Sequence, residues 1–185
     1  NIKILDIKIP DLLPGQILVK LKYTSICHTQ IQEIEGTRGK DKFFPHCLGH
    51  EATGKVLNTG KKVRKVKKGD NVCLTWVPSK GSLESGTNYF SNKIKINAGP
   101  VNTFSNHSII SENKVQKLDS NANLKKNVLL GCAIPTAFNC IFSNIKTSKN
   151  KNILIIGSGG VGLACVYASK FMKFKKIYVL KKVQG

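Results

Sequence analysis

The feature that most constrains the fold is a glycine-rich loop near the end of the chain, with the sequence GSGGVG at residues 157–162. The apolar run NILII at 152–156 precedes the loop and predicts a buried strand. After the loop, apolar residues recur with the spacing of one helical face, at Val161, Ala164, Cys165 and Ala168. A strand, a glycine loop and a helix in this order let backbone N–H groups approach a pyrophosphate. The pattern predicts a dinucleotide-binding loop, and its alternative is a glycine-rich loop within an apolar helical hairpin.

The rest of the chain divides into two regions of different character. Between residues 1 and 127, short β-type runs separated by turn residues predict strands at 16–23, 52–57, 72–77 and 108–115. A stretch rich in Ser, Gly and Asn at 78–100 is expected to be a long surface loop. Further along, the pattern favours a helix over 127–142 and, after the glycine loop, a second strand at 176–180. We predict a mixed α/β protein, with a small β-barrel or curled sheet over 1–127 and one strand–helix–strand unit in 128–185.

The chain carries 30 Lys and Arg residues against 10 Asp and Glu, a formal net charge of +20. Such a surplus can indicate a polyanionic partner, so a basic nucleic-acid-binding protein is one alternative. The densest basic segment, residues 60–70, has no interleaved aromatic residues to stack on bases, which favours a solvated hairpin. No charged segment followed by an apolar stretch occurs near Asn1, and the long apolar run 152–168 is interrupted by glycines. We expect a soluble, cytoplasmic protein that binds neither nucleic acid nor membrane.

Three separated segments each offer one soft or borderline metal ligand: Cys27 in SICHTQ, His50 in LGHEATG and Cys132 in LLGCAIPT. Two thiolates and one imidazole are a donor set that holds a catalytic zinc and leaves a fourth position open. Each residue alone is more typical of packing than of metal binding. The scattered positions of the six Cys residues favour reduced thiols over a disulfide framework. Together with the downstream glycine loop, the three residues predict a zinc site.

In these segments, and in their order along the chain, the sequence resembles the zinc-dependent medium-chain alcohol dehydrogenases (medium-chain dehydrogenase/reductase family). The resemblance runs from PGQILVKLKYTSICHT through GHEATGKV, KKGDNV and LLGCAIPTAF to GSGGVGLA. It implies a GroES-like catalytic domain over residues 1–127. It also implies the N-terminal part of a Rossmann NAD(P)-binding domain, incomplete, over residues 128–185.

The resemblance also implies roles for individual residues. Zinc is expected on Cys27, His50 and Cys132, with Glu51 beside the metal as an occasional ligand. Thr29 matches the hydroxyl residue that hydrogen-bonds the alcohol oxygen and relays its proton. The positions expected near the cofactor are His28, Thr136, Gly157, Ser158, Gly159, Gly160, Val161 and Gly162.

The implied activity is hydride transfer between an alcohol, or an aldehyde or ketone, and NAD(P). One catalytic zinc and no structural zinc are expected, because residues 78–100 contain no Cys. Gln30 stands where an Asp often supports the zinc-bound His, and Gln32 stands where some relatives have a relay His. Lys181 stands where an acidic residue would contact the ribose, which favours a site that tolerates the phosphate of NADP.

The length of the chain departs furthest from this resemblance, because the family needs a complete Rossmann sheet and a closing C-terminal segment. We therefore expect a fragment of a longer reading frame that is inactive as an isolated 185-residue chain. The full-length form is expected to be a homo-oligomer that acts on a small-molecule alcohol or carbonyl substrate. The alternative is a catalytically silent zinc-binding module, or a degenerate copy, that lacks the rest of the cofactor domain. A related zinc-free quinone reductase is disfavoured by the presence of all three ligands.

Overall fold

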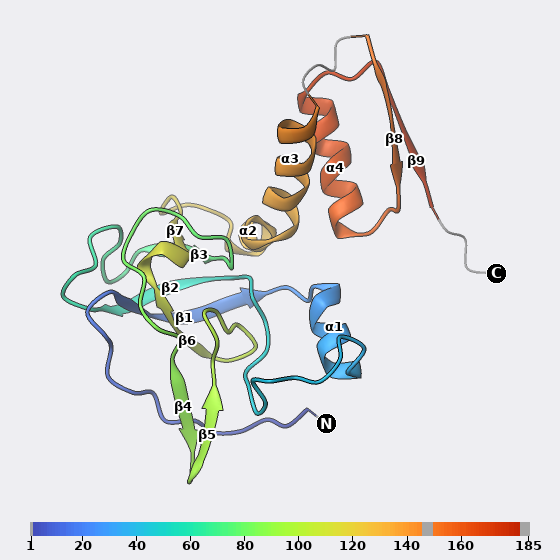
Figure 1. Cartoon of the computed structure of the whole chain (residues 1–185). Helices are drawn as coiled ribbons and strands as arrows, with labels where there is room; N and C mark the ends of the chain where they lie inside the picture. Colours follow the sequence, from blue (N-terminus) through green and yellow to red (C-terminus); the bar gives the residue numbers. More distant parts are fainter. Residues whose placement is uncertain (1, 146–149, 182–185) are drawn as a thin grey trace. The chain divides into compact units, whose positions relative to one another are not determined.

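The computed structural model describes residues 2–145 and 150–181. Contacts within the chain divide it into two compact units, Asn1–Gly131 and Cys132–Gly185. Figure 1 labels the helices and strands of each unit. None of the helices in these residues is both long enough and apolar enough to cross a membrane.

The first unit is built on a five-stranded sheet in the order β6-β1-β2-β3-β7, in which all neighbours are antiparallel (Figure 1). A separate two-stranded hairpin, β4-β5, lies between β3 and β6 along the chain. Two short 3-10 turns occupy Glu112–Lys114 and Val128–Gly131. The strands and helices of this unit are β1 (Gln16–Thr24), α1 (His28–Glu35), β2 (Ala52–Thr59), β3 (Asn71–Leu74), β4 (Asn88–Ser91), β5 (Ile94–Asn97), β6 (His107–Ser111), β7 (Val115–Lys117) and α2 (Leu124–Asn127).

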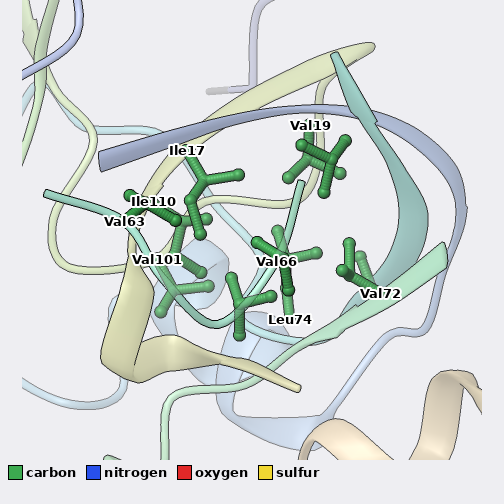
Figure 2. Close-up of a cluster of buried hydrophobic side chains, with 11 residues drawn as sticks. Ile17, Val19, Val63, Val66, Val72, Leu74, Val101 and Ile110 are labelled. Carbon is green, nitrogen blue, oxygen red and sulfur yellow. The ribbon is translucent and has the colours of Figure 1, made fainter. Parts of the chain in front are cut away.

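The curled sheet closes around one apolar core, shown in Figure 2. Alternation along β1 places Ile17 and Val19 inside and Lys20 in solvent, as the sequence pattern predicted. Branched aliphatic side chains from all over the unit complete the cluster, and their removal from water is the main force that holds the sheet. Its members are Ile17, Val19, Ala52, Val56, Val63, Val66, Val72, Leu74, Val101, Ile110 and Val115.

The basic segment 60–70 contributes to this core, so its description as a solvated hairpin is only half right. It forms turns without strand pairing, and its Val63 and Val66 are buried among the branched side chains of the sheet. The Lys and Arg side chains around them reach toward solvent. The valines anchor the segment to the sheet, which explains why they interrupt the basic run.

The expected strand over 108–115 is wrong as a single element. The chain forms β6, turns through Glu112–Lys114 and then begins β7 on the opposite edge of the sheet. The cause is the Glu112 side chain, whose oxygens accept from the backbone N–H groups of Arg64, Lys65 and Ser82. A carboxylate that serves three donors holds the turn in place.

The expected long surface loop over 78–100 is also wrong in part, because it contains the β4-β5 hairpin. Tyr89 and Ile96 pack inward from this hairpin and are buried. The Tyr89 hydroxyl accepts a hydrogen bond of 2.9 Å from the N–H of Ile109, which ties the hairpin to β6. The strands NYFS and IKIN are four residues each, too short for their alternation to stand out from the surrounding polar residues.

The second unit contains one parallel strand–helix–strand unit, as the sequence predicted, preceded by a helix. Its elements are α3 (Ala133–Asn144), β8 (Asn152–Ile156), α4 (Gly160–Phe171) and β9 (Lys176–Leu180). The rings of Phe138, Phe142 and Phe171 join α3 to α4, with centroids 5.5 to 6.5 Å apart. The helix expected over 127–142 begins later, at Ala133, because Val128–Gly131 forms a 3-10 turn.

Candidate functional site

Strand register brings one end of three strands together. Thr24, the last residue of β1, pairs with Ala52, the first residue of β2. Ala52 also pairs with Leu74, the last residue of β3. The segments that follow β1 and β3 and the segment that precedes β2 therefore lie at the same end of these three strands. They carry Cys27 after β1 and His50 before β2.

The ligand atoms of Cys27, His50 and Cys132 lie within 4.8 Å of one another. The structure thus brings together the three residues that the sequence analysis proposed as zinc ligands. Two sulfurs and one imidazole nitrogen at this separation form a donor set suited to zinc.

Gly131 fixes the position of the backbone next to Cys132. This role was not predicted from the sequence. Its carbonyl oxygen accepts a hydrogen bond of 2.6 Å from Thr75 Oγ1, immediately after β3. A Cβ at position 131 would lie 2.5 Å from Glu51 Cβ and 2.6 Å from the carbonyl oxygen of Leu74, so a side chain has no room there. Since Cys132 is bonded directly to Gly131, this contact anchors its backbone at the edge of the sheet. A glycine next to a candidate ligand was the only signal of this in the sequence.

His50 has one ring nitrogen facing Gln30 and the other without a partner in the described part of the chain. Its Nδ1 lies 2.7 Å from Gln30 Nε2, so this ring nitrogen is already engaged. Its Nε2 is buried, and no hydrogen-bond partner for it occurs among the described residues. Burial lowers the pKa of the imidazole, and the nearby Glu33 carboxylate opposes that effect. A buried ring nitrogen without a partner, beside two sulfurs, suits a zinc ion when the hydrogen of the neutral imidazole lies on Nδ1 instead.

Two other thiols in the first unit have properties that disfavour metal binding. Burial, and secondarily the Glu51 carboxylate, raise the pKa of Cys73 to about 12. Burial also raises the pKa of Cys47. Both groups therefore remain protonated thiols at neutral pH. This disfavours metal binding, because the thiolate is the form that binds metal. Glu51 itself is buried but lies outside the group of three, so its role as an occasional ligand stays a prediction.

Helix α1 begins beside the first sulfur and carries two further candidate residues. Thr29 Oγ1 lies 3.7 Å from Cys27 Sγ, which places a hydroxyl next to the donor cluster. His28 precedes it at the first helical position and is exposed. This helix is not evident from the sequence, because its residues HTQIQEIE show only a weak apolar pattern. Gly36 ends it in the left-handed conformation, at φ +71°.

The glycine loop of the second unit forms as predicted between β8 and α4. Gly157 has φ +107°, a conformation that favours glycine, and Gly162 packs so close that a Cβ would meet the carbonyl oxygen of Gly157. By contrast, a Cβ on Gly157, Gly159 or Gly160 would meet no atom within 4 Å. The loop therefore presents bare backbone at the N-terminus of a twelve-residue helix, which suits an anionic group.

Three other predicted cofactor positions are accessible or partly so. Thr136 lies in the first turn of α3, where its N–H donates to the carbonyl of Cys132, and it is exposed. Val161 follows the glycine loop and is exposed, while Ser158 within the loop is half-buried. Their contacts with a cofactor, and that of His28, stay predictions.

Comparison with known proteins decides the family. The profile of the alcohol dehydrogenase GroES-like domain matches residues 13–120, more than half of the chain. The chain belongs to this family. The resemblance to the zinc-dependent alcohol dehydrogenases is thereby confirmed, and so is a mixed α/β fold with a GroES-like sheet.

Individual proteins similar to this chain also carry dehydrogenase names or share its fold. An S-(hydroxymethyl)glutathione dehydrogenase of Photobacterium damsela subsp. piscicida is 26% identical over 204 residues, covering 97% of this chain and 55% of the relative. The crystal structure of benzyl alcohol dehydrogenase from Acinetobacter calcoaceticus has a TM-score of 0.77 at 24% identity, over 96% of this chain and 54% of that one. The structure of CAD from Helicobacter pylori complexed with NADP(H) has a TM-score of 0.68 at 26% identity, over 89% and 51%. The chain spans about half the length of these relatives.

Proposed function

We propose that this chain is part of a zinc-dependent oxidoreductase that transfers a hydride between an alcohol, or an aldehyde or ketone, and NAD(P). The observation that carries the proposal is the convergence of Cys27, His50 and Cys132 within 4.8 Å. Because the chain spans about half of its relatives, we further propose that it is a fragment and that the isolated 185-residue chain is inactive.

A zinc ion held by Cys27, His50 and Cys132 would supply Lewis-acid polarisation of a substrate oxygen. The chain's own residues would handle the proton and the approach of the substrate. The Thr29 hydroxyl would accept a hydrogen bond from an alcohol and pass its proton outward, a role supported by its distance of 3.7 Å from Cys27 Sγ. Gln32 cannot titrate, so the proton must leave through water or another group.

The glycine loop would bind the diphosphate of NAD(P). No atom lies within 4 Å of where a Cβ would stand on Gly159 or Gly160, so a diphosphate could approach the backbone N–H groups at the start of α4, where the helix dipole favours an anion. The side chains proposed to line the rest of the cofactor site are His28, Thr136, Ser158 and Val161. Lys181, exposed just after β9, favours a site that accepts the extra phosphate of NADP.

A single zinc per chain is proposed. Residues 78–100 contain no Cys, and part of this stretch forms the β4-β5 hairpin. A structural zinc of the four-sulfur type therefore has no ligands in that segment.

The remaining parts of the proposal concern the full-length protein. Its partner would be a small-molecule alcohol or carbonyl compound, without nucleic acid or membrane, and it would act in the cytoplasm as a homo-oligomer. The names of the relatives, which include an S-(hydroxymethyl)glutathione dehydrogenase and a benzyl alcohol dehydrogenase, support an alcohol substrate. A catalytically silent zinc-binding module remains the second candidate, because half of the relatives' length is not covered.

The first experiment measures zinc. Protein expressed with zinc and dialysed should retain one zinc per chain, counted by elemental analysis, and Cys27→Ser or Cys132→Ser should abolish it. Cys140→Ser is the matched control, because this thiol is exposed and lies outside the group of three. Zinc retained by the Cys27 and Cys132 variants would contradict the proposed site.

The second experiment measures turnover and separates the two candidates. The complete reading frame should oxidise primary or secondary alcohols, with concomitant reduction of NAD or NADP that absorbance measures. A complete protein that holds zinc but reduces neither cofactor with a panel of alcohols, or oxidises neither with aldehydes, would favour the silent module.

A further inference from the structure

The side-chain amide of Gln30 lies between two candidate metal ligands: it contacts the ring of His50 and the backbone of Cys27. Gln30 is only 2% exposed, so both polar ends of its side chain depend on protein partners. Its Oε1 accepts a hydrogen bond of 3.2 Å from the N–H of Cys27, where α1 begins. Its Nε2 lies 2.7 Å from His50 Nδ1. One side chain thus contacts both the Cys27 backbone and the His50 ring.

The chemistry of an amide limits what this side chain can do. Its oxygen only accepts hydrogen bonds, and its nitrogen only donates them. While the oxygen accepts from Cys27, the NH₂ group faces His50 Nδ1, which must then accept. In a neutral imidazole, an accepting Nδ1 places the hydrogen on Nε2.

This tautomer is unsuitable for a metal ligand. Nε2 is the ring nitrogen left without a hydrogen-bond partner among the described residues, and it is the one free to bind a metal. To bind a metal through Nε2, His50 needs its hydrogen on Nδ1, and that hydrogen needs an acceptor. Reversing the Gln30 amide would supply the acceptor, but it would turn the NH₂ group toward the N–H of Cys27. Two donors would then face each other at the start of α1.

We propose that Gln30 is a positioning residue that weakens zinc binding, because its amide cannot serve Cys27 and His50 in the metal-binding tautomer at the same time. This inference rests on the proposed zinc site. A carboxylate of the same length would remove the conflict, since both of its oxygens accept. Gln30→Glu should therefore hold the Cys27 N–H and a hydrogen on His50 Nδ1 together.

Zinc affinity provides the first measurement. In the full chain, competition with a chromophoric chelator should show that Gln30→Glu binds zinc about tenfold more tightly than the wild type, the scale typical of groups that orient a metal ligand. Gln32→Glu is the charge-matched control on the same helix, because residues two apart on a helix do not face the same side. Gln30→Met keeps the length but orients neither group, and it should bind zinc more weakly than Gln30→Glu.

The tautomer of His50 provides the second measurement, in metal-free protein. Two-bond ¹H–¹⁵N correlation spectra show which ring nitrogen carries the hydrogen. With only four His residues in the chain, the signals of His50 can be assigned by replacing the other three in turn. The wild type should carry the hydrogen on Nε2, and Gln30→Glu should carry it on Nδ1.

The outcomes separate this inference from the proposed function. Zinc binding by neither wild type nor Gln30→Glu would refute the proposed zinc site, while the spectra would still test the tautomer. Zinc binding by the wild type with no gain in Gln30→Glu, or an equal gain in Gln32→Glu, would overturn the role of Gln30. A wild-type His50 with its hydrogen on Nδ1 would overturn it as well.

Discussion

The two units of the chain treat their apolar residues differently. The five-stranded sheet of the first unit encloses its branched side chains, and Ile17 at its centre is 0% exposed. The two strands of the second unit leave most of theirs in solvent, with Leu154 at 60% and Ile156 at 77% exposed. The expectation of a buried strand at 152–156 is therefore correct only for Ile155. Both sets of residues are equally apolar. The difference shows that an apolar strand is buried only when enough neighbouring strands and helices cover it.

Core truncation should show the largest contrast between the units. Ile17→Ala should lower the free energy of unfolding by about 3 kcal/mol, because it opens a cavity in a closed core. Leu154→Ala should change it by less than about 0.5 kcal/mol, because the side chain is exposed. Urea unfolding followed by circular dichroism compares both variants, and fluorescence of Trp76, the only Trp, reports on the first unit. Equal losses would show that β8 is covered as well as β1.

Glycine substitutions should give the next largest contrast. A Cβ on Gly54 would lie 2.4 Å from the carbonyl oxygen of Lys20, between β2 and β1, so Gly54→Ala should cost about 2.5 kcal/mol. Gly159→Ala, where no atom lies within 4 Å of a Cβ, should cost less, about 0.5–1 kcal/mol, because Ala is a poorer residue than Gly at the position before α4. Thermal unfolding of the two variants checks this. A larger loss in Gly159→Ala would mean that the glycine loop is more crowded than described.

Glu112 provides a smaller, pH-dependent effect that belongs to the first unit alone. Burial tends to raise the pKa of its carboxyl, but hydrogen bonds from the backbone of Ser82, Arg64 and Lys65 outweigh burial and lower it below its ordinary value of 4.5. The ionised group therefore stabilises the folded unit fully above about pH 4.5, and this contribution is lost as the pH falls through the lowered pKa.

Glu112→Gln should accordingly cost about 2 kcal/mol near neutral pH, because an amide cannot accept from all three donors. The variant should lose less stability than the wild type when both are acidified below pH 4.5. Urea midpoints across a pH series measure both effects. A difference between wild type and variant that persists unchanged into acid would contradict this account.

The smallest expected effect concerns the surface of the same unit. Lys117 Nζ lies 2.9 Å from Asp70 Oδ2, but the Lys side chain is half exposed. Lys117→Met should change the free energy of unfolding by about 0.5 kcal/mol or less, since the Lys67 N–H still donates to Asp70. A loss as large as that of Glu112→Gln would show that this exposed charge pair stabilises the fold as much as the buried Glu112 carboxylate does. Unfolding in low and high salt would test that.

Sequence patterns predicted the fold best where local periodicity and final burial agree. The alternation of β1 and the strand–loop–helix order around the glycine loop are both local signals, and both were confirmed. The β4-β5 hairpin was missed, because Tyr89 is buried by contacts with β6 that no local pattern carries. Helix α1 was missed for the opposite reason, since it is mostly polar and its Ile31 and Ile34 are partly exposed.

The candidate metal ligands could be predicted from the sequence, but the hydrogen bonds that hold them in position could not. Cys27, His50 and Cys132 could be chosen from the sequence because their donor atoms suit one metal. The hydrogen bond from Thr75 to Gly131 could not, since it depends on where β3 ends in space. The same holds for the direction in which the Gln30 amide faces His50.

The tight seat of Gly131 also bears on how such a chain tolerates insertions and deletions. The Thr75 hydroxyl holds the Gly131 carbonyl, and no side chain fits at that position. The backbone of Gly131 is therefore fixed relative to β3, whatever the length of the segment before it. Changes of length in the segment 118–123 would be absorbed before this point. The sulfur that follows would keep its starting position, so the exposed residues 119–121 are where added sequence would disturb the candidate site least.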